Sequence, residues 1–275
     1  MRIAEILAER QSKHRLSGGE FNLSSGMWAS VSGANARTQV VDTVANNLAN
    51  VNTVGFKAQR LVSKQQEFAD TLAGVLPGVP ERAKGDQERT PGVMHIESVT
   101  DFSPGPVSFT GNPLHVAVSK ENQFFVVQTP EGDMYTRAGN FQLNSEGTLV
   151  TADGKVVLGE GGQIAVTGSN AQITANGTVM VNGQAAGKLR VVEFEDTKGL
   201  DRREGTRFVS KDGNAPAAVT SAYVIPQSLE MANVSVVGSM VDMISAQKSF
   251  ESYAKSIQTI NELNETSLRT ARSQG

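Results

Sequence analysis

The feature that most constrains this chain is a seam of apolar residues with helical spacing near each of its ends. At the amino-terminal end the seam alternates steps of four and three, which places its members on one face of an α-helix. Its members are Met27, Val31, Ala34, Thr38, Val41, Ala45 and Leu48. We predict a helix near residues 25–51, because Ser24 or Ser25 can cap its start and Gly55 marks a point beyond its end.

The seam near the carboxy terminus is longer and broader. Its members are Val236, Met240, Met243, Gln247, Phe250, Ala254, Ile257, Asn261, Asn264, Leu268 and Ala271, and Val237, Ile244, Tyr253 and Ile260 widen it. An apolar face this broad on a helix of about 40 residues favours more than one neighbouring helix. The amide side chains within the seam need hydrogen-bond partners, so we expect them to help set the register of an assembly.

Between the two helical segments, short β-like runs alternate with turn signals. The turns are predicted at Glu131-Gly132, Glu146-Gly147, Asp153-Gly154, Asn176-Gly177, Asn182-Gly183 and Asp212-Gly213. Asn-Gly and Asp-Gly tolerate the positive φ angles that tight hairpins require. The clearest strands are predicted at residues 114–118, 124–129, 148–151, 155–158, 178–181 and 189–194.

These patterns predict a mainly β protein: an antiparallel β central domain flanked by amino- and carboxy-terminal α-helices, which form a coiled-coil-like assembly domain. The predicted parts are a disordered extension over 1–22, a helical assembly segment over 23–60, a connecting segment over 61–84, the β domain over 85–226 and a second helical assembly segment over 227–275.

Composition argues against several classes of partner. The formal net charge is −3 and the sequence pI about 5.7, which gives no electrostatic drive toward nucleic acid or anionic lipid. We therefore expect no nucleic-acid partner and no direct membrane insertion. The chain has no cysteine, which suits a protein that moves from a reducing to an oxidising compartment. Glu5 and Glu9 interrupt the apolar core that a secretory signal would need.

No pattern in the sequence points to catalysis, and we predict no catalytic, cofactor-binding or metal-binding residue. His14, His95 and His115 lack the paired spacing of metal ligands. The run GQAAGK from Gly183 to Lys188 resembles a phosphate-binding loop only superficially, because it has too few residues between its glycines and no following Ser or Thr. We interpret it as part of a hairpin.

Two segments carry a resemblance to a known family. ANNLANVNTVGFK, from Ala45 to Lys57, resembles the amino-terminal signature of bacterial flagellar rod and hook proteins. LEMANVSVVGSMVDMISAQKSFE, from Leu229 to Glu251, is similar to their carboxy-terminal signature. YTRAGNFQLNSEGTLVT, from Tyr135, resembles a segment of their β domain, so the resemblance covers about residues 23–272.

The resemblance implies a structural subunit of the flagellar basal-body rod, most like the proximal-rod F-type subunit. It implies a torque-transmitting tube in the periplasm, with the end helices in its inner layer. The implied partners are other copies of the chain, other flagellar rod subunits and the flagellar type III export apparatus, which would export the chain without cleaving a signal peptide.

We predict an assembly interface on the two helical segments. The apolar seams supply most of it, and the asparagines near the end of the first helix join it because their amides can satisfy backbone groups of a neighbouring subunit. The set is Met27, Val31, Ala34, Val41, Ala45, Asn46, Asn47, Leu48, Asn50, Val236, Met240, Met243, Gln247, Phe250, Ala254, Ile257 and Leu268.

Periodicity alone leaves other interpretations open. The two seams could form an ordinary helix hairpin within one chain, docked on the β domain, since most amphipathic helices face their own core. The chain could also be a distal-rod or hook subunit of the same family. A different class, an exported β-rich adhesin or binding module, would use the helices as a stalk, and a glycan-active enzyme would require a cleft lined by carboxylates.

Overall fold

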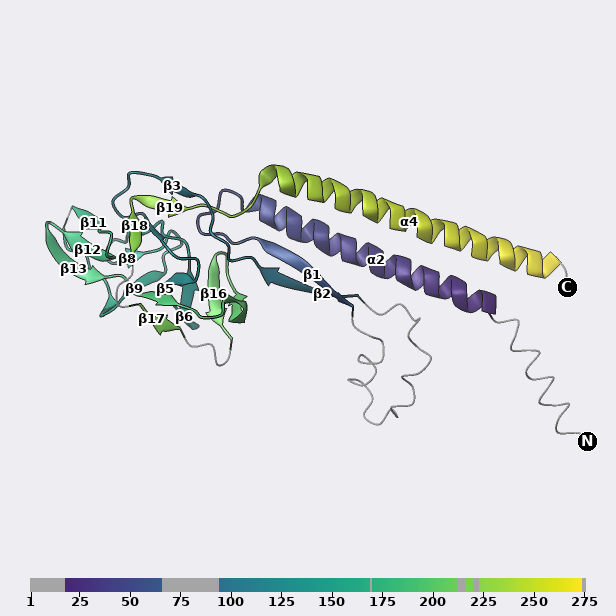
Figure 1. The fold of residues 1–275 in the computed structure, drawn as a ribbon, viewed down its shortest axis with the longest axis horizontal. Helices are drawn as coiled ribbons and strands as arrows, with labels where there is room; N and C mark the ends of the chain where they lie inside the picture. The colour runs from purple at the N-terminus through teal and green to yellow at the C-terminus, as the bar shows by residue number, and fades with distance from the viewer. Residues whose placement is uncertain (1–17, 66–93, 169, 212–215, 220–222, 274–275) are drawn as a thin grey trace, which may run out of the picture. The chain divides into compact units, whose positions relative to one another are not determined.

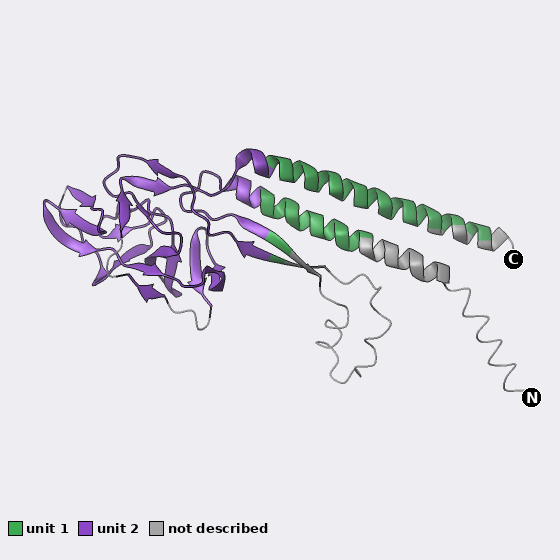
Figure 2. Cartoon of the chain, in the orientation of Figure 1, with its two compact units in different colours: residues 1–44, 61–97, 240–275 green, residues 45–60, 98–239 purple. Residues whose placement is uncertain are grey.

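The computed structural model describes residues 18–65, 94–168, 170–211, 216–219 and 223–273. The chain divides into two compact units, coloured in Figure 2. Unit 1 falls within residues 1–44, 61–97 and 240–275, and unit 2 comprises residues 45–60 and 98–239. Unit 2 therefore contains the end of the first helix as well as the β structure.

Two long helices occur in the described residues, α2 (Gly18–Ala49) and α4 (Val236–Ser273). Both were predicted, but α2 begins at Gly18 rather than near residue 25, because the intervening residues contain no proline to interrupt a helix. The Ser235 hydroxyl caps α4 by accepting a hydrogen bond from the Gly238 N–H at 3.2 Å.

Within unit 1, α2 and α4 lie side by side and run in opposite directions (Figure 1). They pack closely at Gly33 of α2, where an added Cβ atom would come within 2.7 Å of the Tyr253 ring. Gly33 therefore permits the close approach of the two helices, and the pair forms the main part of unit 1.

The remaining elements of the described residues are short strands and one 3₁₀ turn. Their bounds are β1 Gln59–Gln65, β2 Met94–Thr100, β3 Val107–Phe109, β4 Val116–Val118, β5 Gln123–Thr129, β6 Gly132–Thr136, β7 Gln142–Leu143, β8 Leu149–Val150, β9 Val156–Gly159, β10 Gly162–Gln163, β11 Ala171–Ile173, β12 Thr178–Val181, β13 Gln184–Lys188, β14 Val191–Glu193, η3 Thr197–Gly199, β15 Leu200–Arg202, β16 Arg207–Ser210, β17 Ala217–Ala218, β18 Val224–Pro226 and β19 Ser228–Glu230. Each of the six predicted strands corresponds to one of them.

The β structure of unit 2 is antiparallel, as predicted. Its largest sheet has ten strands, with the order β15-β16-β6-β5-β9-β8-β7, while β10 pairs with β9, β14 with β5 and β17 with β14. A three-stranded sheet has the order β11-β12-β13, and β18-β4 and β19-β3 are two-stranded. The β19-β3 pair is important for the site, because its register sets Glu230 opposite Val107.

The predicted turns adopt the expected backbone. Asn182 and Gly183 both have positive φ, 50° and 82°, and connect β12 to β13. This is the combination that suits a two-residue hairpin, so the GQAAGK run is the second strand of a hairpin and not a phosphate loop. The predicted turn at Asp212-Gly213 lies outside the described residues.

The described residues of unit 2 form two apolar clusters. The larger is mainly aliphatic, and Val116, Val157 and Val179 are fully buried in it. The smaller is aromatic and contains Phe124 and Phe208, whose rings meet edge to face with centroids 6.0 Å apart. These clusters make the β sheets a rigid support for the charged residues described next.

Candidate functional site

Three charged side chains are buried together in unit 2. Lys57, Arg137 and Glu230 form what we call the ionic cluster. The Lys57 ammonium lies 2.7 Å from Glu230 Oε1, and an Arg137 guanidinium nitrogen lies 2.7 Å from Glu230 Oε2. Their side chains are at most 1% exposed. The cluster thus joins the segment that follows α2, the loop after β6 and the end of β19.

The surrounding backbone satisfies the remaining hydrogen-bonding groups of the cluster. Lys57 donates to the Ser103 carbonyl at 2.7 Å, and the Gly105 N–H donates to Glu230 Oε1 at 3.0 Å. Arg137 donates to the Gln123 carbonyl at 2.7 Å. Buried charges are tolerated only when they are paired and hydrogen-bonded in this way.

Electrostatics favours an ionised carboxylate in the cluster. Burial alone would raise the pKa of the Glu230 carboxyl, but the charges and hydrogen bonds of Arg137 and Lys57 outweigh burial and hold that pKa below its ordinary value. Burial lowers the pKa of the Lys57 ammonium, against the attraction of Glu230, and the nearby Arg137 charge lowers it further. One carboxylate therefore balances two cations.

A glycine allows the chain to approach the cluster closely. Gly55 has φ +68° and donates its N–H to the Glu230 carbonyl at 2.8 Å. A Cβ atom at Gly55 would overlap the backbone at Ala138. Gly55 is therefore required both for its backbone conformation and for the space that it leaves.

Two asparagine amides fasten the same region. Asn47 donates to the Gln59 carbonyl at 2.8 Å and accepts from the Gln59 N–H at 2.9 Å. Asn233 accepts from the Ala58 N–H at 2.7 Å and donates to the Asp101 carbonyl at 2.9 Å. The end of α2 and the segment before α4 are thereby hydrogen-bonded to the chain on either side of the ionic cluster.

Arg202 lies outside the ionic cluster and packs against the segment that contains Phe56 and Lys57. Its guanidinium lies 4.4 Å from the centroid of the Phe56 ring and donates to the Lys57 carbonyl. Burial lowers the pKa of Arg202 to about 10. The arrangement is suited to holding chain segments in place and offers no activated nucleophile, and among the described residues no group of His, Cys, Asp or Glu is placed to hold a metal ion.

Sequence reasoning did not single out the ionic cluster. Lys57 and Glu230 stood inside the two terminal signatures, and Arg137 stood inside YTRAGNF, but each was considered as part of a motif. A usable signal was present: each of the three segments places a charged residue among small and apolar residues. Such a charge needs a buried partner, and one acidic and two basic segments are complementary.

The predicted interface residues divide by exposure. Exposed members are Ala45, Asn46, Val236, Met240, Gln247 and Phe250, and half-buried members are Val31, Val41, Leu48, Asn50, Met243, Ala254 and Ile257. Ala34 and Asn47 are buried. The side chains of Met27 and Leu268 lie outside the described residues. Asn47 differs from its expected role, because its amide bonds to the backbone of its own chain rather than being left for a neighbour.

The face of α4 that packs within the chain overlaps the predicted seam only in part. Ala246 is buried, and the half-buried positions are Ser239, Met243, Ser249, Tyr253, Ala254, Ile257 and Ile260. Tyr253 lies against Gly33 of α2. The two helices therefore pack against each other within one chain along this face. Among the described side chains of α4, seven large apolar ones nevertheless remain exposed: Val236, Val237, Met240, Val241, Ile244, Phe250 and Leu263.

Comparison with known proteins gives three matched segments. Residues 27–57 match the model of the flagella basal body rod protein, residues 120–181 the D1 domain of the flagellar hook proteins FlgE/F/G, and residues 225–270 the C-terminal region of the flagellar basal body rod FlgEFG proteins. The flagellar basal-body rod protein FlgG of Bacillus subtilis (strain 168) is 31% identical over 86% of this chain and 95% of its own length. The flagellar basal-body rod protein FlgF of Caulobacter vibrioides is 32% identical over 83% of this chain and 90% of its own length.

The chain belongs to the flagellar basal-body rod protein family. It is a structural rod subunit of the F/G type and not an enzyme, because the family is one of structural rod proteins. Membership places the chain in the flagellar basal body, where its partners are other rod subunits. Among the described residues, α2 and α4 are not apolar enough over a sufficient length to span a membrane.

The family segments also explain the ionic cluster. Each of the three matched segments contributes one member: Lys57 ends the first, Arg137 lies in the second and Glu230 in the third. The terminal signatures of this rod protein therefore have an internal role, which is to fix the chain segments that lead into its two long helices.

Proposed function

We propose that this rod subunit polymerises through the exposed faces of α2 and α4 and thereby forms the torque-transmitting axle in the periplasm. The observation that carries the proposal is the exposed apolar surface of α4. Val237 is 73% exposed, Val241 60% and Ile244 53%. These residues lie four and three positions apart, so they share one helical face.

The energetics favours burial of this face against another helix. Each such side chain contributes roughly 1.5–3 kcal/mol when it is fully buried. A soluble protein rarely exposes a continuous apolar face without a binding role. Contacts that join two different faces of identical subunits give an open helical polymer when the rotation between subunits does not close a ring. A rod with many copies is the natural product of such contacts.

We propose a proximal-rod position of the F type, which the relative FlgF of Caulobacter vibrioides supports. A distal-rod position is the second candidate, because the FlgG relative of Bacillus subtilis matches at a comparable identity. Labelled electron microscopy of purified basal bodies distinguishes the two, because a proximal subunit is located at the cytoplasmic end of the rod and a distal subunit at the outer end.

We also propose export through the flagellar type III apparatus without cleavage of a signal peptide. The absence of cysteine is compatible with passage of an unfolded chain into an oxidising compartment. The mass of the protein extracted from basal bodies is the test. A mature protein shortened at its amino terminus by a signal peptidase would contradict this route.

The assembly proposal is tested on α4. Ile244→Asp and Phe250→Asp should each abolish incorporation into basal bodies and motility, because a carboxylate at the subunit contact loses apolar burial and must be desolvated. The melting temperature of unit 2 should stay unchanged. Ser256→Asp, at an exposed position of the same helix, is the matched control and should be tolerated. Normal assembly of both apolar-to-Asp variants would refute polymerisation through this face.

A further inference from the structure

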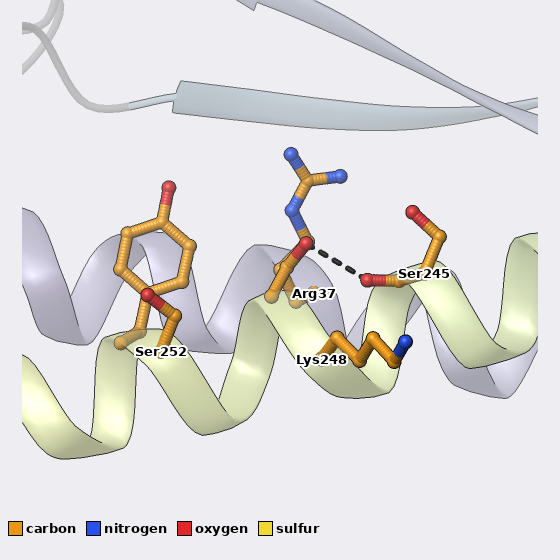
Figure 3. Close-up of a pocket in the computed structure, with 6 residues that line it drawn as sticks. Arg37, Ser245, Lys248 and Ser252 are labelled. Carbon is orange, nitrogen blue, oxygen red and sulfur yellow. Dashed lines mark hydrogen bonds between the residues drawn. The ribbon is translucent and has the colours of Figure 1, made fainter.

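A polar hollow lies between α2 and α4 within unit 1. Its volume is about 390 Å³, and its walls are Arg37 of α2 together with Ser245, Lys248, Ser249, Ser252 and Tyr253 of α4. Figure 3 shows Arg37 on one helix and Ser245, Lys248 and Ser252 on the other. The lining contains two cations and several hydroxyl groups, and it contains no carboxylate.

The two cations of this hollow lack an ionic partner in the part of the chain that the structure describes. None of the ion pairs between described residues involves Arg37 or Lys248. Both side chains are exposed, and their charged ends extend in different directions (Figure 3). The hollow therefore presents two separate positive charges, which suits a ligand with more than one carboxylate better than a single small anion.

The same chain carries such a pair of carboxylates further along α4. Glu262 and Glu265 are three positions apart and exposed. The stretch from 258 to 266 contains these two acids and no Lys or Arg. Glu265 has one weak partner, Arg269 at 3.7 Å on the surface, whereas no ion pair between described residues involves Glu262. Glu251 also lies on α4, but Lys248 and Lys255 flank it in the sequence, so this stretch is not acidic overall.

We propose that the hollow between α2 and α4 receives Glu262 and Glu265 of a second copy of this chain. The inference rests on the proposed polymerisation and adds its axial register. Subunits of a helical polymer point the same way along its axis, so Glu262 of one copy meets Lys248 of another when the two are shifted by fourteen residues of helix. At 1.5 Å per residue the shift is about 21 Å.

The charges set the axial alignment of neighbouring copies, whereas burial of the apolar face provides most of the binding free energy. Exposed ion pairs contribute little to affinity, but like charges placed opposite each other oppose the wrong alignment. An unshifted parallel pair sets Lys248 against Lys248 and Glu262 against Glu262, so it is disfavoured. In the shifted pair both repulsions are absent, and Glu262 of one copy attracts Lys248 of the other.

Disulfide cross-linking tests the register, because the natural chain has no cysteine. The variant Lys248→Cys/Glu262→Cys replaces the natural protein in cells, and purified basal bodies are oxidised gently. We expect a ladder of covalent multimers of this chain on a denaturing gel. The matched control is Lys248→Cys/Asp242→Cys, which pairs the same lysine position with an acidic position toward the other end of α4 and should give no ladder.

Charge reversal provides a second test. Lys248→Glu alone and Glu262→Lys alone should each reduce incorporation into basal bodies about tenfold, and the double variant Lys248→Glu/Glu262→Lys should restore it to within about twofold of the natural protein. High salt should weaken the effect of the single changes.

The outcomes separate this inference from the proposed function. If cross-linked basal bodies contain no ladder, or if both single reversals incorporate normally while Ile244→Asp does not, the register is wrong and polymerisation through α4 stands. If Ile244→Asp itself incorporates normally, polymerisation through this face fails, whatever the charge variants do. A ladder together with rescue by the double reversal would establish the register.

Discussion

Glu230 holds two distant segments of unit 2 together, because it pairs with a cation from each of them. Its carboxylate is the only acidic member of the ionic cluster, and it contacts both Lys57 and Arg137 at 2.7 Å. Removing it would leave two buried cations facing each other. The loss of one partner of a buried pair is far more damaging than the removal of the whole pair, because the remaining charge cannot be resolvated.

Glu230→Gln should therefore reduce the free energy of unfolding of unit 2 by about 3–5 kcal/mol. Glutamine keeps the shape and one carbonyl acceptor, so the change isolates the charge. Urea denaturation of the full chain, followed by near-ultraviolet circular dichroism, measures the loss. Glu131→Gln, at an exposed turn, is the control and should change stability little. A loss in Glu230→Gln no larger than in this control would show that the cluster is dispensable.

The same residue predicts a pH dependence. The folded-state pKa of Glu230 lies below its ordinary value of 4.5, so the folded state binds a proton at this site less readily than the unfolded state. Its contribution to stability is complete well above pH 4.5 and is lost as the pH falls through the folded-state pKa. The natural chain should lose stability in acid more steeply than Glu230→Gln does, as measured by thermal melting between about pH 3 and 6.

At the residue scale, the sequence predicted turns better than contacts. Asn182-Gly183 could be predicted because positive φ is a local property of the residues themselves. The partners of Asn47 and Lys57 could not, since Glu230 is 173 positions from Lys57 along the chain. Asn47 was assigned to the interface only because an asparagine amide needs hydrogen-bond partners. The backbone of Gln59 in the same chain meets that need equally well.

At the scale of elements, apolar periodicity is sufficient to predict the two long helices but not how they pack against each other. The steps of four and three predicted both helices, but they did not show which part of the broad face of α4 packs against α2. Gly33 decides this, because its missing side chain lets the Tyr253 ring approach. The packed face is centred near Ala246 and Tyr253, and Met240, Gln247 and Phe250 of the predicted seam are left exposed.

Gly33→Leu should separate the two helices. The substitution raises intrinsic helix propensity but places a side chain in the position of the Tyr253 ring. We expect the helical signal at 222 nm to melt at a lower temperature, with the β transition unchanged. Asn35→Leu, which adds the same side chain at an exposed position of α2, is the control. Tyr253→Ala should partly restore the Gly33→Leu variant, and no change in helix melting would argue against close packing at Gly33.

Some strands could be predicted from the sequence and others could not. The strands β5, β9 and β12 follow clear apolar runs and were predicted, because burial selects β-branched and aromatic residues there. The strand β3 is exposed along its length, so its sequence carries no burial signal. The strand β19 stands within the segment assigned to the carboxy-terminal helical part, and its pairing with β3 is a tertiary feature.

For the molecule as a whole, the sequence predicted the order of helix, β domain and helix, but not the composition of unit 2. This unit includes residues 45–60, which the sequence pattern assigns to the helical segment. The reason is the ionic cluster and the asparagine amides, which join that stretch to residues far along the chain. A local sequence pattern does not show to which compact unit a segment belongs.

Limited proteolysis of the monomer should therefore leave a resistant core that contains both Lys57 and Glu230. Cleavage should remove much of α2 and α4, because their exposed faces lack the neighbours that a polymer would supply. Mass spectrometry of the products identifies the boundaries, and gel filtration shows whether nicked pieces stay together. A resistant core that begins after residue 60 and still melts cooperatively would contradict the inclusion of residues 45–60.

The order of the ionic cluster along the chain also affects when the molecule becomes rigid. A ribosome releases Lys57 first, then Arg137 and only later Glu230, so two like charges wait for the carboxylate that neutralises them. Until then, bringing the early segments together is electrostatically unfavourable. The cluster therefore closes only once Glu230 has joined the two cations, so Lys57 and Arg137 do not hold the early segments together before then.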